Sequence, residues 1–141
     1  MAYKFLEHTA DIKIHVEDKS IVKAFSESAL AFNELILRHE KIEIAGEIKK
    51  KIYIAGKDDC ALLYNFLEEF LYLLDAEDFI LSRINKIHIT RGKLDAELIG
   101  DKASNYKISN DVKAITYNEM KVEKKKAGKK NNYIIEFVVD V

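Results

Sequence analysis

Polar and apolar residues alternate along several stretches of the chain, beginning near its start. Between residues 12 and 17, each isoleucine or valine is followed by a charged residue or a histidine. This period of two is typical of a strand with one buried and one exposed face. Strands are predicted over residues 3–7, 12–17, 47–55, 84–91, 94–100, 111–125 and 133–141.

Two other stretches carry apolar residues at helical spacing. Ser20 is a typical N-cap residue, and the apolar positions behind it predict a helix that runs from residue 21 to about residue 39. A second helix follows Asp58 or Asp59, whose negative charge suits the positive end of a helix. Its apolar stripe ends before the polar residues 75–78 and consists of Leu63, Phe66, Leu67, Phe70 and Leu74.

The order of these elements predicts the class of fold. Turns at residues 92–93 and 127–132 predict hairpins in the second half of the chain. We therefore expect an α+β fold with two helices packed on one face of a mainly antiparallel sheet of about seven strands, a two-layer architecture in a single domain over residues 1–141. Four aromatic residues should be buried between the layers: Phe25, Phe32, Phe66 and Phe70.

Composition excludes several classes of protein. A chain of 141 residues with 48% hydrophobic and 33% charged residues is expected to form one globular core. The net charge of -1 gives no general attraction to nucleic acid or to anionic membranes, so any RNA role needs a local patch or a partner protein. With one cysteine, no apolar leader and no stretch long enough to span a bilayer, we expect a cytoplasmic protein.

The most suggestive polar residues lie near the two ends of the sequence. Asp11 closes a short polar connection that leads into the second predicted strand, and Asp140 precedes Val141. If the first and last strands share a rim, these carboxyl groups repel each other unless a cation or a proton intervenes. Oxygen ligands favour Ca²⁺ or Mg²⁺ over Zn²⁺. Alternatively, Asp11 binds amide groups of its own turn, and Asp140 is a frayed terminal residue.

Other polar residues have simpler interpretations. Cys60 lies in an apolar helical start and is expected to pack there. His15, His39 and His88 have no acidic or cysteine cluster at metal-ligand spacing in the sequence, so we expect them to be solvated or packed. The basic run at residues 49–51 is interpreted as solvated charge that discourages edge pairing between sheets.

Four blocks of the sequence resemble one known family. The blocks read FLEHTADI at residues 5–12, LYNFLEEFLYLLDAE at 63–77, DVKAITY at 111–117 and VVDV at 138–141. Together, in this order, they resemble the archease family. Two positions depart from the family pattern: Asn118 stands where a histidine is common, and Phe66 stands where a tryptophan is common.

The resemblance implies a function. Archeases are small accessory proteins of the RtcB-type RNA ligase in tRNA splicing, and they promote guanylylation of the ligase, its multiple turnover and a broader use of nucleotides. The family binds a divalent cation, usually calcium, through positions that correspond to Asp11, Asp140 and Val141. We also expect His8, Asp101 and Lys113 to take part in activation or in a transient contact with the ligase. No catalytic role, membrane contact or sequence-specific nucleic-acid binding is expected.

Two other classes of function remain open at this point. A metal-dependent hydrolase could use Asp11 and Asp140 as ligands, although the sequence offers no obvious base or nucleophile beside them. A general chaperone or modulator of nucleic-acid-processing proteins would need an exposed apolar patch, which the regular amphipathic stripes do not indicate.

Overall fold

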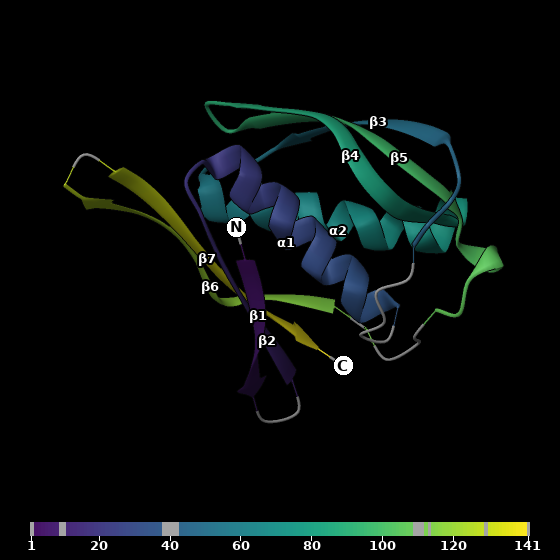
Figure 1. The fold of residues 1–141 in the computed structure, drawn as a ribbon, viewed down its shortest axis with the longest axis horizontal. Coiled ribbons are helices and arrows are strands. Elements are labelled where there is room, and N and C mark those ends of the chain that lie inside the picture. The colour runs from purple at the N-terminus through teal and green to yellow at the C-terminus, as the bar shows by residue number, and fades with distance from the viewer. Residues whose placement is uncertain are drawn as a thin grey trace.

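The computed structural model describes residues 2–8, 11–37, 43–108, 112, 114–128 and 130–140 (Figure 1). It contains seven strands and two α-helices within these residues. The strands are antiparallel to their neighbours and form two sheets. The prediction of an α+β fold with two helices and about seven antiparallel strands is therefore confirmed.

The first sheet has the strand order β1-β2-β7-β6. It joins the beginning of the sequence to its end, because β2 pairs with β7 along the whole length of β2. Its strands are β1 (Ala2–His8), β2 (Asp11–Asp18), β7 (Lys130–Asp140) and β6 (Ala114–Ala127).

The second sheet has the order β3-β5-β4 and comes from the middle of the chain. A tight turn at residues 91–92 connects β4 and β5, close to the predicted position. The strands are β3 (Ile48–Ala55), β5 (Lys93–Lys102) and β4 (Phe79–Thr90).

Both helices begin at the predicted caps. α1 (Ile21–Ile36) starts after Ser20, whose hydroxyl accepts a hydrogen bond from the Lys23 amide at 3.0 Å. α2 (Asp59–Glu77) starts after Asp58, whose carboxylate accepts one from the Ala61 amide at 2.8 Å. These bonds satisfy amide groups that the first turn of a helix leaves unpaired.

The position of the helices differs from the prediction. The two helices lie between the two sheets and not on one face of a single sheet (Figure 1). α1 contacts β2 on one side and β4 on the other, while α2 contacts β6 on one side and β3 and β4 on the other. The alternating pattern shows which residues of a strand face inwards, but it does not show which strands share a sheet.

β4 is the element whose extent the sequence pattern predicted least well. It begins at Phe79, before the predicted start at residue 84. Its first three residues are all buried, and the register against β5 shifts between Leu81 and Arg83 and again between Ile84 and Lys86. Such irregularities break the period of two, so the early part of the strand carries no alternating signal.

The aromatic core lies between the helices and the sheets, as predicted. Phe66 is completely buried, with its ring centroid 5.9 Å from that of Phe25 and 5.0 Å from that of Phe70. Phe32 is also completely buried. The predicted apolar faces of both helices therefore pack together at the centre of the molecule.

Across the part of the chain that the structure describes, no helix has the length and apolar character needed to cross a membrane.

Candidate functional site

One row of paired residues runs across all four strands of the first sheet. His8 is paired with Asp11, Asp11 with Asp140, and Asp140 with Ala114. Directly opposed residues of antiparallel strands project to the same face of the sheet. The carboxylates of Asp11 and Asp140, from opposite ends of the sequence, therefore share one face where β2 begins and β7 ends.

A hydroxyl group orients one of these carboxylates. Thr116 on β6 donates a hydrogen bond to Oδ1 of Asp140 at 3.2 Å, and both side chains are half-buried. Sequence reasoning missed Thr116, although its place two residues after Ala114 puts it on the same face. Asp11 is half-buried as well. We call Asp11 and Asp140 the acidic pair. The atoms that this pair can offer to a metal ion are carboxylate oxygens.

The donor set of the acidic pair suits a hard cation but does not complete its coordination. Carboxylate and hydroxyl oxygens are ligands that Ca²⁺ and Mg²⁺ prefer. Within the described residues, however, no three or more histidine, cysteine, aspartate or glutamate residues are grouped closely enough to hold a metal ion. A cation here needs further oxygens, from water or from residues outside the described part.

Three of the predicted site residues fall partly or wholly outside the described residues. Val141, which follows Asp140, and Lys113, which precedes Ala114, are outside them altogether. The backbone of His8 is described and is paired with Asp11, but its side chain is not described. Their assigned roles stay predictions.

Asp101 lies on the other sheet, where it has a structural partner. Its carboxylate accepts hydrogen bonds from the Tyr106 hydroxyl and the Lys102 amide, both at 2.7 Å. The Tyr106 bond is the main reason why the pKa of Asp101 is lowered, and the Lys102 amide lowers the pKa further. Tyr106 also accepts a bond from the Ala45 amide at 3.0 Å. Through Tyr106, Asp101 therefore connects the residues near Ala45 to the end of β5. The predicted contact of Asp101 with a partner protein stays a prediction.

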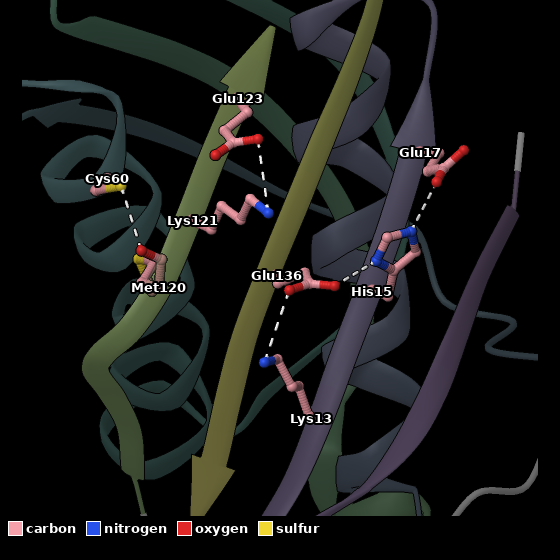
Figure 2. A network of polar contacts seen from close by, with 8 residues as sticks. All are labelled: Lys13, His15, Glu17, Cys60, Met120, Lys121, Glu123 and Glu136. Atoms are coloured by element: carbon pink, nitrogen blue, oxygen red, sulfur yellow. Dashed lines mark hydrogen bonds and ion pairs between the residues drawn. The ribbon is translucent and has the colours of Figure 1, made fainter. Parts of the chain in front are cut away.

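A network of charged residues occupies the same face of the first sheet as the acidic pair (Figure 2). His15 lies between two carboxylates, with Nδ1 2.6 Å from Glu136 and Nε2 2.9 Å from Glu17. Lys13 approaches Glu136 at 3.6 Å. Since carboxylates only accept, both His15 contacts are hydrogen bonds at once only when each ring nitrogen carries a proton. The expectation of a merely solvated or packed His15 missed these partners.

The network changes the acidity of its carboxyl groups. The hydrogen bond from His15 is the main reason why the pKa of Glu136 lies below its ordinary value, and Lys13 lowers the pKa further. The hydrogen bond from His15 also lowers the pKa of Glu17. Glu136 lies opposite His15 in the register of β2 and β7. The contact between these two residues therefore becomes visible only when the pairing of the two strands is known.

Cys60 behaves as a packing residue. Its thiol lies 3.7 Å from the carbonyl oxygen of Met120 on β6. Figure 2 shows this contact between α2 and β6. Partial burial raises the pKa of the Cys60 thiol, and the nearby Asp58 and Asp59 raise the pKa further. A raised thiol pKa disfavours the thiolate, which is the nucleophilic form.

Known proteins match this chain over nearly its full length. The model of the Archease protein family (MTH1598/TM1083) matches residues 3–141. Protein archease of Pyrococcus furiosus is 36% identical, covering 99% of this chain and 98% of that protein. Protein archease of Methanosarcina mazei is 28% identical, covering 95% of this chain and 94% of that protein.

Two solved structures share the fold. The solution structure of Methanobacterium thermoautotrophicum protein 1598 has a TM-score of 0.75 and 23% identity, and the match covers 99% of this chain and 98% of that one. The crystal structure of a Thermotoga maritima archease, described as a possible chaperone, has a TM-score of 0.59 and 19% identity, and covers 98% of this chain and 96% of that one. With a family model that spans almost every residue and a relative at 36% identity, the chain belongs to the archease family.

Proposed function

We propose that this protein is a non-catalytic activator of an RtcB-type RNA ligase and that the acidic pair is the centre of its activity. The observation that carries the proposal is the facing of Asp11 and Asp140 across β2 and β7 in a chain of the archease family. Two carboxylates on one face of a sheet repel each other, and a divalent cation relieves that repulsion. The cation is proposed to be Ca²⁺, with Mg²⁺ as the second choice.

The ligands proposed for the cation are Asp11, Asp140 and Val141. Calcium takes about six to eight oxygens, so water completes a shell that has so few protein ligands. Such a site binds weakly, with a dissociation constant of about 10⁻⁵ to 10⁻³ M. His8 and Lys113 belong to the same end of the sheet by sequence position, and we assign them to the ligase contact.

Activation of an enzyme by a partner requires differential affinity. The protein must bind the state of the ligase that accepts a guanylyl group more tightly than the spent state, because equal affinity shifts no equilibrium. It must then dissociate so that the ligase can turn over. The contact is therefore transient and at the small end of interface sizes.

The exposed surface supports this proposal over a general chaperone. A chaperone that holds unfolded chains needs a continuous apolar patch. Among the described residues, the exposed large hydrophobic side chains are one isoleucine and three tyrosines: Ile48, Tyr53, Tyr72 and Tyr117. Tyrosine carries a hydroxyl group, so these residues supply little purely apolar surface.

The test is RNA ligation with the partner ligase at a concentration below that of the RNA. Asp11→Asn and Asp140→Asn each remove a charge and keep the side-chain shape, so each should abolish the added turnovers while thermal unfolding stays unchanged. Asp75→Asn, at an exposed position of α2, is the matched control and should activate normally. Full activation by both Asp11→Asn and Asp140→Asn contradicts the proposal.

The cation is tested separately by calorimetric titration with Ca²⁺. Each variant of the acidic pair should lose Ca²⁺ binding, and residues added after Val141 should weaken it if the terminal carboxylate is a ligand. Calcium binding that survives both substitutions would place the ion elsewhere.

A further inference from the structure

The outer face of the second sheet is a surface that the proposed function does not use. The helices cover the inner face, where Ile52 and Leu98 are buried. Because neighbouring residues of a strand project to opposite faces, Lys51 and Tyr53 project outwards from β3. Within the described residues, no helix or strand covers this outer face.

Cations dominate the outer face. The pairing register and the alternation along β5 place five of them there, against the three carboxylates Asp95, Glu97 and Asp101. The excess of positive charge stands out in a chain whose net charge is -1. The five cations are Lys49 and Lys51 on β3, Arg83 and Lys86 on β4, and Lys93 on β5.

Part of this charge is already paired. Glu97 lies 3.5 Å from Lys49 and accepts a hydrogen bond from Asn85, and Arg83 lies 3.1 Å from the exposed Glu47. Asn85 and Lys49 lower the pKa of Glu97, which keeps this carboxyl group ionised. The outer face still carries more cations than carboxylates after these pairs are formed.

Tyr53 lies on the edge strand β3 of this charged surface, two residues after Lys51. Its side chain is 80% exposed, the highest value among the exposed large hydrophobic residues of the described chain. It faces Asp95 across the strand pair, and Asp95 faces His88. A hollow of about 250 Å³ opens beside the ring and is lined by Tyr53, Ile54, Ala55, Lys93, Leu94 and Asp95.

We propose that the outer face of the second sheet binds single-stranded RNA. The Tyr53 ring offers a flat surface on which an unstacked base can lie, and the hollow beside it gives that base room. Lysines in the neighbouring rows contact the phosphates on either side. Binding of this kind tolerates many sequences, because every base has a flat face.

Polar groups on the same face of the sheet as Tyr53 favour RNA as the occupant. Asp95 accepts hydrogen bonds from base amino groups or from a ribose 2′-hydroxyl. Thr90 and His88 are 2.7 Å apart and add a donor and an acceptor on the same face. Positive charge alone would suit an acidic protein equally well, but an exposed ring beside an open hollow suits a base. A duplex keeps its bases stacked and has no base to place on the ring.

This proposal is independent of the ligase and of the acidic pair, which belongs to the first sheet. The test uses the purified chain without ligase and a fluorescein-labelled single-stranded RNA of about ten nucleotides, followed by fluorescence anisotropy. Tyr53→Ala should weaken binding by about 5- to 150-fold, which corresponds to the loss of one stacked base. Tyr53→Phe should bind like the natural protein because it keeps the ring.

Two matched controls accompany these variants. Tyr72→Ala removes another exposed tyrosine, on α2, and should leave RNA binding unchanged. Lys51→Ala should lower the slope of log affinity against log salt by about 0.7, the value for one phosphate contact on a single strand. Lys125→Ala removes an exposed lysine of β6 on the other sheet and should leave the slope unchanged.

Several results overturn the proposal. Equal losses of affinity from Tyr53→Ala and Tyr72→Ala would mean that the ring is not a stacking platform. Duplex RNA or single-stranded DNA that binds as tightly as single-stranded RNA would remove the assignment to RNA. A polyglutamate peptide that binds more tightly than RNA would assign the outer face to an acidic protein.

Discussion

Thr116 shows how a residue without acid or base chemistry affects an acidic site. Its hydroxyl donates to the Asp140 carboxylate and so limits the directions in which that group can point. A carboxylate held in one direction loses less conformational freedom when it binds a cation. A search of the sequence for charged residues overlooks such a partner, because threonine is common in strands for reasons of packing.

Phe66 is the residue whose loss should most affect the core. It is completely buried and lies between the rings of Phe25 and Phe70. Phe66→Ala should lower the free energy of unfolding by about 3–5 kcal/mol, through lost burial and the cavity that remains. Urea denaturation measures this loss.

The control for Phe66 lies on the same helix. Tyr72 is 56% exposed, so Tyr72→Ala should change the free energy of unfolding by no more than about 0.5 kcal/mol. A loss below about 1 kcal/mol for Phe66→Ala would mean that the buried face of α2 is assigned wrongly.

At the scale of elements, alternate residues of β2 face the buried core on one side of the sheet and the charged network on the other. Ile14 and Val16 face α1 and are completely buried, while Lys13 and His15 face the charged network with Glu136. The alternation predicted correctly that these two groups face opposite sides. It could not predict the partners of His15, because Glu136 belongs to a strand from the other end of the sequence.

The charged network predicts a dependence of stability on pH. The pKa of Glu136 is lower in the folded protein than its ordinary value of 4.5, mainly because His15 donates a hydrogen bond to it. A carboxyl group of this kind stabilises the fold above its unfolded pKa, and the stabilisation is lost as pH falls through the lowered folded value. The free energy of unfolding should therefore decline as the pH falls below the ordinary value.

Substitution of His15 tests this dependence. His15→Ala should reduce stability near neutral pH and make the acid decline shallower, as measured by urea denaturation at several pH values. His88→Ala is the control, because the ring of His88 makes its hydrogen bond with the uncharged hydroxyl of Thr90 at 2.7 Å. Identical slopes for His15→Ala and the natural protein would contradict the role given to the network.

At the scale of the whole molecule, the sequence predicted the elements better than their arrangement. The caps Ser20 and Asp58 and the buried phenylalanines carry local signals, so the starts of both helices along the sequence and their buried faces were predicted correctly. The division into two sheets depends on contacts between distant strands, which no local pattern records. The sequence predicts that Asp11 and Asp140 lie close together, because each is at the end of a terminal strand. The register of β2 and β7 places the two residues opposite each other.

The separation of β2 and β7 along the chain also predicts the order of folding events. Pairing them closes a loop of nearly the whole chain, whereas β4 and β5 are joined by a tight turn. Long loops cost more entropy to close, so we expect the hairpin to form early and the β2–β7 pair late. Val139→Ala on β7 should mainly speed unfolding, and Leu98→Ala on β5 should mainly slow refolding.

Folding and unfolding rates measured across a range of urea concentrations provide the test. Val139 and Leu98 are both completely buried, so both substitutions should lower stability enough for reliable comparison. A slower refolding rate for Val139→Ala, with no change for Leu98→Ala, would reverse the proposed order.

The central place of β7 in the first sheet has a consequence for the protein during its synthesis. A ribosome makes β2 and β6 before β7, yet both strands need β7 as their neighbour. Until β7 emerges, each of them presents an edge with unpaired backbone groups to the crowded cell interior. Exposed edges of this kind can join with those of other nascent chains. Slow translation of the last strand would therefore lengthen the period in which the growing chain needs protection by the cell's own chaperones.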